Sequence, residues 1–241
     1  MRLALRAEWA KLRTVPDAAV AVPLIALLTV AVSIPAATAS SADVVKSSLL
    51  GVQLGQAAVA VWAVHALAGE YGTGLIRATF TALPRRFDVL LAKAALLLTG
   101  VLAACVPAIV ASVVFARVYA DGYPSLGSAA VLRAATGSVL YLCLITLLAL
   151  GVAAAVRSAV AASGIVLGLL YLTPAVLGMF NNEDWQHWIY RLSPSTAGLS
   201  IQSSVDLAGL PIGPWAGLGV AAAWAFGVFG VGALILRGRD V

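Results

Sequence analysis

Residues 69–93, GEYGTGLIRATFTALPRRFDVLLAK, form the longest polar interruption between two long apolar runs of the chain. Ile76, Phe80 and Leu83 follow one another at i, i+4 and i+7, and this spacing predicts a short helix with one apolar face. We expect the helix to end at Pro84, because proline lacks an amide donor and its ring clashes with the preceding turn. The segment is therefore predicted to connect two membrane spans through an amphipathic helix.

The composition of the chain is that of an integral membrane protein. Hydrophobic residues make up 62% and charged residues 10% of the 241 residues, whereas soluble domains carry about 25% charged residues. The mean hydropathy is +1.01. This length accommodates roughly six spanning helices of about 20 residues each. We predict a single all-α transmembrane domain over residues 1–241, because the longest weakly hydrophobic stretch, 181–214, is too short to fold alone.

The expected spans are the apolar runs of the sequence. They cover about 18–36, 48–68, 94–119, 132–156, 159–180 and 215–236. Residues 2–15 precede the first span, and Leu5, Trp9 and Leu12 cluster on one side of a helical wheel beside basic residues. This pattern predicts an interfacial amphipathic helix.

Two other interpretations of the N-terminal segment remain open. It could be a solvated basic tail that only sets the topology. It could also begin a signal peptide with a cleavage site at residues 37–39, which read ATA. The second interpretation is disfavoured because the basic region is long and amphipathic, and everything after the first span is also membrane-like.

The distribution of lysine and arginine predicts the orientation. With six spans, the N-terminal segment, residues 69–93, Arg157 and the C-terminal end share one side and carry eleven of these residues. The opposite side carries four, namely Lys46, Arg117, Arg133 and Arg191. The positive-inside rule therefore places both termini and the 69–93 segment in the cytoplasm, at a cytoplasmic membrane. The same rule accounts for the net charge of +5 without a nucleic-acid partner.

The long connection at 181–214 faces the opposite side in this topology. It contains Trp185, Trp188 and Tyr190, which are typical interface anchors. A short pair of helices dipping into the outer leaflet and a plain surface loop are both compatible with this sequence.

The sequence contains no motif for catalysis or metal binding. Cys105 and Cys143 lie inside apolar runs and are expected to act as small hydrophobic residues. His65 and His187 fall on opposite sides of the predicted membrane, and His65 is better explained as an interfacial histidine than as a proton relay. We therefore expect no catalytic, metal-binding or cofactor-binding residue in this chain, and an energy source on a partner.

Several segments resemble the permease subunits of bacterial ABC-2 type transporters. They are RAEWAKLR at 6–13, EYGTG at 70–74, RAT at 77–79, ALPRR at 82–86, LAK at 91–93 and LSP at 192–194. The resemblance extends over the whole chain in topology and is strongest between Glu70 and Lys93.

The resemblance implies a six-span subunit that pairs with a second copy or a similar permease. A separate ATP-binding subunit, which holds ATP and magnesium, would dock beneath it and push on the 69–93 helix. The implied docking residues are Arg6, Glu8, Trp9, Arg13, Glu70, Tyr71, Gly74, Arg77, Phe80, Arg85 and Arg86. For Glu70 and Arg77, ordinary helix-surface charge is the alternative.

The resemblance further implies a substrate path lined by the second and fifth spans. Gln53 and Gln56 are candidates for it, and packing roles are equally open. The predicted function is export of a hydrophobic or amphiphilic compound, such as a drug, peptide or lipid. The alternatives are a non-transporting membrane sensor or scaffold, and an intramembrane enzyme that works without ATP.

Overall fold

The computed structural model describes residues 2–14, 17–39, 42–75, 81, 86–177, 179 and 183–238. Six helices in this part of the chain are long and apolar enough to cross a membrane. This finding confirms the prediction of an all-helical multi-pass membrane protein with six candidate spans.

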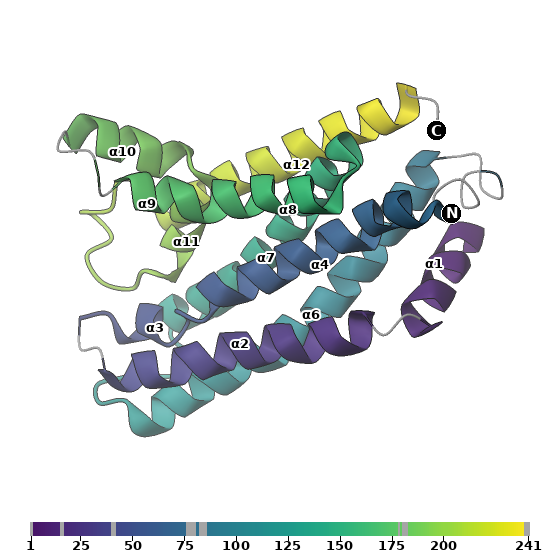
Figure 1. Cartoon of the computed structure of the whole chain (residues 1–241). Coiled ribbons are helices and arrows are strands. Elements are labelled where there is room, and N and C mark those ends of the chain that lie inside the picture. Colours follow the sequence, from purple (N-terminus) through teal and green to yellow (C-terminus); the bar gives the residue numbers. More distant parts are fainter. Residues whose placement is uncertain are drawn as a thin grey trace.

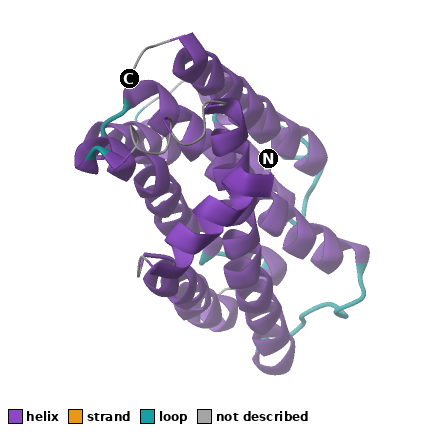
Figure 2. Ribbon diagram, turned by 90° about the vertical axis from the view of Figure 1, so that its right-hand side faces the viewer, coloured by secondary structure: helices purple, strands orange, loops and turns teal. Residues whose placement is uncertain are grey.

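The helices follow one another in antiparallel order along a bundle (Figure 1). Helix α1 and the C-terminal end of α12 lie at one end, here called the terminal face, and α3 and α10 lie at the other, here called the loop face. Figure 2 shows the same bundle with the terminal face turned toward the viewer. The helices are α1 (Arg2–Thr14), α2 (Asp17–Ala39), α3 (Val44–Ser47), α4 (Val52–Thr73), α6 (Arg86–Tyr119), α7 (Ala129–Val156), α8 (Ala159–Leu167), α9 (Thr173–Leu177), α10 (Glu183–Leu192), α11 (Pro194–Leu199) and α12 (Pro214–Gly238).

Helix α7 forms the centre of the bundle. Tyr141, Leu142 and Leu148 on this helix are completely buried, and α7 packs against α4, α6, α8 and α12. By contrast, α2, the α8–α9 segment and α12 bury only a minor share of their apolar residues inside the chain. Their exposed apolar side chains, such as Leu27 and Phe226, suit a hydrocarbon solvent.

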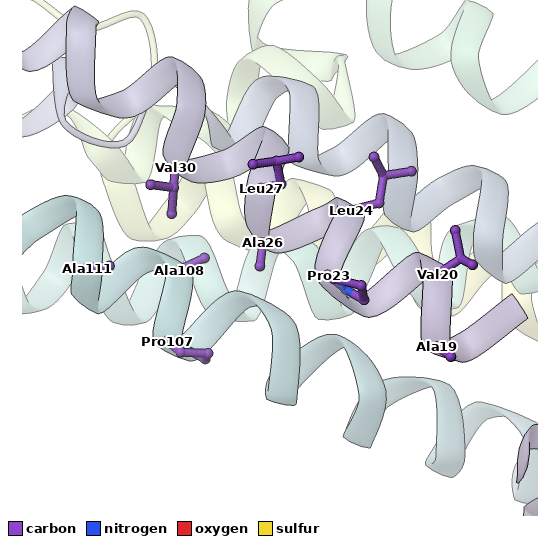
Figure 3. A pocket seen from close by; sticks show the side chains of 10 residues that line it. All are labelled: Ala19, Val20, Pro23, Leu24, Ala26, Leu27, Val30, Pro107, Ala108 and Ala111. Carbon is purple, nitrogen blue, oxygen red and sulfur yellow. The ribbon is translucent and has the colours of Figure 1, made fainter. Parts of the chain in front are cut away.

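The surface between α2 and α6 carries an apolar groove of about 820 Å³ (Figure 3). Pro23 and Leu24 on α2 and Pro107 on α6 contribute to it, and every side chain that lines it is apolar. The groove therefore offers no polar side chain that could orient a hydrophilic ligand.

The second and third spans differ from their predicted bounds. Helix α4 continues to Thr73, and α6 begins at Arg86 rather than at 94. The charged residues before 94 are typical of a connection between spans. In the structure they belong to α6, and Lys93 can be buried there because it is paired with carboxylates. The predicted amphipathic helix is not tested, since residues 76–80 and 82–85 lie outside the described part.

The fifth span is present, but it is not one continuous α-helix. A π-helical turn at Gly168–Leu172 separates α8 from α9, and Pro174 follows it. Proline removes an amide that an ordinary helical turn would use, and a wide turn is a common accommodation. The connection after this span carries the two helices α10 and α11, so it is more than a plain loop. Its depth in a membrane stays a prediction.

Two glycines allow α7 and α12 to touch. A Cβ atom on Gly232 would lie 2.3 Å from the carbonyl oxygen of Gly151, and one on Gly151 would lie 2.6 Å from the backbone of Val228 and Phe229. These distances are shorter than any ordinary contact with a Cβ atom. Small residues at such crossings let the backbones of membrane helices approach closely.

The crossing of α7 and α12 predicts that Gly232→Ala destabilises the protein by about 1–3 kcal/mol, because the extra methyl group forces the helices apart. Gly230→Ala is the matched control, since nothing lies within 4 Å of the position that a Cβ atom would take there and alanine favours the helix. The free energy of unfolding of both variants in mixed detergent micelles tests the prediction. Equal effects of the two substitutions would show that the close approach is unimportant.

Candidate functional site: a charge cluster at the terminal face

Four charged side chains from three helices meet at the terminal face. Lys93 on α6 places its Nζ 2.7 Å from Oε2 of Glu8 on α1 and 2.9 Å from Oε1 of Glu70 on α4. Lys11, also on α1, places its Nζ 2.8 Å from Oε1 of Glu8 and 3.0 Å from Oε1 of Glu70. Each ammonium group therefore contacts both carboxylates, and the cluster has no net charge.

Three members of this charge cluster are withdrawn from water. The exposed fraction is 2% for Glu8, 5% for Lys93 and 9% for Glu70. A buried charge without a partner destabilises a fold strongly, whereas paired and hydrogen-bonded charges are tolerated. The burial of each residue is therefore possible only while the opposite charges stay in place, and this requirement fastens α1 to the ends of α4 and α6.

The sequence of α1 explains which of its faces packs on the bundle. Ala4 and Glu8 are one helical turn apart and both are buried, so a small residue lets the helix come close beside the charged one. Trp9, by contrast, is 49% exposed, and Leu5 is only partly covered. Trp9 of the predicted apolar side therefore faces outward, where an interfacial helix would meet lipid, and Glu8 and Lys11 face the protein.

The pairing changes the acidity of the two α1 residues. Burial alone would raise the pKa of the Glu8 carboxyl, but the ammonium groups of Lys93 and Lys11 outweigh burial and lower this pKa. Burial alone would lower the pKa of the Lys11 ammonium, but its hydrogen bonds to Glu8 and Glu70 raise it. Both shifts favour the charged forms that build the cluster.

A cation–π contact and a hydrogen bond join other helix ends at the terminal face. The guanidinium carbon of Arg157 lies 5.4 Å from the ring centroid of Tyr71, at cation–π distance. Arg157 occupies the turn between α7 and α8 with φ = 61°, so these two helices are joined by a tight turn. Arg86 donates from Nη1 to the carbonyl oxygen of Leu236 at 3.2 Å, which joins the start of α6 to the end of α12.

The predicted docking residues fall into different environments. Glu8 and Glu70 face inward and contact residues of this chain, whereas Arg6 and Trp9 are exposed on α1. Gly74 ends α4 with φ = 73°. Docking to a second protein stays a prediction for all of them, and for the two carboxylates the structure shows contacts within the chain.

The remaining docking residues are less completely described. Tyr71 makes the cation–π contact with Arg157, and Arg86 donates to the carbonyl oxygen of Leu236. Arg77, Phe80 and Arg85 lie outside the described residues, and Arg13 is described only as part of the backbone of α1.

The two glutamines predicted to line a substrate path take part in interhelical hydrogen bonds. Gln56 is 2% exposed and accepts from the Tyr141 hydroxyl on α7. The backbone carbonyl of Gln53 accepts from the Tyr171 hydroxyl in the π-helical turn. Gln56 therefore has the packing role that was left open, and a contact with substrate stays a prediction.

Three residues that make contacts at the terminal face were not among the docking residues predicted from the sequence. Lys11 stands three residues after Glu8 on one side of the helix, a spacing that favours an ion pair. Lys93 was assigned to the end of the polar segment, because no pattern in the sequence shows that its partner lies on α1. Arg157 was counted only among the basic residues that set the orientation, and its contact with Tyr71 depends on how α4 and α7 pack.

No group of three or more histidine, cysteine or acidic residues that could hold a metal ion occurs in the described ranges. In comparisons with known proteins, no family model and no curated protein matches the chain. The fold therefore defines the class of the protein, a multi-pass helical membrane protein with six candidate spans.

The charge cluster predicts that Lys93→Met destabilises the protein by roughly 3–5 kcal/mol, because Glu8 and Glu70 then share only Lys11. Lys46→Met, at the loop face, is expected to change stability by less than about 0.5 kcal/mol. Chemical unfolding in mixed micelles measures both. Adding Glu8→Gln to Lys93→Met should recover part of the lost stability. If the effects of the two substitutions on stability simply added, the ion pairs of the cluster would be contradicted.

The lowered pKa of Glu8 predicts that acid releases α1. The stabilisation is fully present above the ordinary carboxyl pKa of 4.5 and is lost as the pH falls through the lower pKa of the folded protein. On the alkaline side, the contribution of Lys11 is lost only as the pH rises above 10.5, through its raised pKa.

A nitroxide spin label on Ala7→Cys, in a variant without native cysteines, reports the mobility of α1. We expect the label to gain mobility below about pH 4.5 and to be mobile already at neutral pH when Glu8→Gln is present. Unchanged mobility of the label in the Glu8→Gln variant at neutral pH would show that the ion pairs do not hold α1.

Proposed function

We propose that this chain is the transmembrane permease subunit of an ATP-driven exporter. A separate ATP-binding subunit would dock at the terminal face, and the transported compound would be hydrophobic or amphiphilic. Two copies, or one copy and a similar permease, would form the transporter, with the terminal face in the cytoplasm. In this proposal the chain contributes no catalytic residue of its own.

The observation that carries the proposal is the charge cluster. It fastens α1 to the ends of α4 and α6, the two helices that flank residues 74–85. A push on α1 or on that connection would therefore move two spanning helices together. A stiff element joined to moving spans is what force transmission between subunits requires. The outward-facing side chains of Arg6 and Trp9 on the same helix are suitable for contact with a partner.

The alternatives are an ATP-independent scaffold, a sensor and an intramembrane enzyme. A buried charge cluster whose members pair with one another serves stability and coupling better than proton transfer, since the pairing favours the charged form of each group.

The proposal is tested by purifying the tagged chain from its native membrane with a mild detergent. An ATP-binding subunit should co-purify, and proteoliposomes that contain the complex should hydrolyse ATP. Arg6→Glu combined with Trp9→Ala should lower the amount of ATP-binding subunit recovered about fivefold, equivalent to ~1 kcal/mol.

Arg117→Glu, at an exposed position near the opposite end of α6, is the matched control and should leave recovery unchanged. Enzymatic activity of the purified chain without any ATP-binding subunit would favour the intramembrane enzyme. Equal recovery with the α1 variant and the control would contradict docking at the terminal face.

A further inference from the structure

The aromatic helix α10 carries a small hollow at the loop face. Trp185 and Trp188 stand one helical turn apart and are 56% and 62% exposed. Their ring centroids are 6.5 Å apart and the rings are inclined by 71°, so the two indoles form the walls of a corner. Together with Asp184 they line a hollow of about 260 Å³.

These three side chains match the chemistry of an ammonium ion. The face of an indole ring attracts cations more strongly than any other side-chain ring, and substituted ammonium groups are bound by aromatic corners of this kind. A carboxylate beside the rings adds a full negative charge. We propose that Asp184, Trp185 and Trp188 form a binding site for a substituted ammonium group.

The attachment of α10 keeps the hollow in place. Trp224 on α12 donates from Nε1 to the carbonyl oxygen of Leu192 at 2.8 Å, and Arg191 donates from Nε to the carbonyl oxygen of Pro211 at 2.5 Å. The C-terminal half of α10 is thus fixed to the bundle, and the N-terminal half presents the hollow.

The position of α10 suggests where the ammonium group comes from. The helix lies at the loop-face end of the bundle, where the spanning helices end (Figure 1), and tryptophan prefers the headgroup level of a bilayer. The headgroup of an amine-bearing phospholipid and a free organic cation share the required chemistry. The inference does not depend on the proposed export function.

A simpler role for the two indoles is to anchor α10 at the membrane surface. An anchor needs the amphipathic indole at the headgroup level, but it does not bind a soluble cation. It also does not need Asp184. These differences make the two roles separable by substitution.

The test uses the full chain in nanodiscs of digalactosyldiacylglycerol, a neutral lipid without an ammonium group. Radiolabelled tetraethylammonium should bind saturably to the native protein. Trp185→Leu and Trp188→Leu should each weaken binding about two- to fivefold, the range expected for one exposed cation–π contact. Trp188→Phe should retain more binding than Trp188→Leu, and Asp184→Asn should also weaken it.

Trp215→Leu is the matched control, because Trp215 is 59% exposed at the loop-face end of α12 but does not line the hollow. Competition by added phosphatidylcholine would identify a lipid headgroup as the occupant, and its failure to compete would identify a free cation. Non-saturable binding, or equal binding to the α10 variants and the control, would overturn the proposal.

Discussion

The mutual neutralisation of Glu8, Lys11, Glu70 and Lys93 is the interaction on which the terminal face depends. None of the three buried members could stay in so apolar an environment alone, and each is retained because the others are. Such a cluster is close to all-or-none, since removal of one charge leaves a partner uncompensated. It therefore gives a small N-terminal helix a firm attachment that apolar packing of a few side chains could not provide.

The same interaction explains which parts of the fold could be predicted from the sequence. The six spans follow from hydropathy, because runs of about 20 apolar residues have few other uses. The ends of the spans do not follow. Lys93 and Asp88 have the composition of a loop, and only a carboxylate on another helix shows that Lys93 belongs inside α6. Tertiary pairing therefore decided a boundary that local composition placed about two helical turns away.

The candidate site was predictable in part for a related reason. Glu8 and Glu70 were among the docking residues implied by the family resemblance, and the structure brings them together. Their contact with each other through two lysines could not be deduced, since a helical wheel shows which residues share a face but not which face is buried. On α1 the charged face packs and the face with Trp9 is exposed, the reverse of the usual arrangement on a soluble helix.

The π-helical turn at Gly168–Leu172 gives the fifth span one surplus backbone residue relative to an ordinary α-helix. A single-residue deletion within this turn would restore a continuous α-helix and leave the direction of the following segment nearly unchanged, because the wide turn takes one residue more to complete the same rotation. Side chains within the turn would change direction, among them Tyr171, which bonds to α4. The turn therefore sets the direction of the side chains inside it, and a shift of the bulge along the helix is a way to reorient the residues that it passes without unwinding the rest of the span.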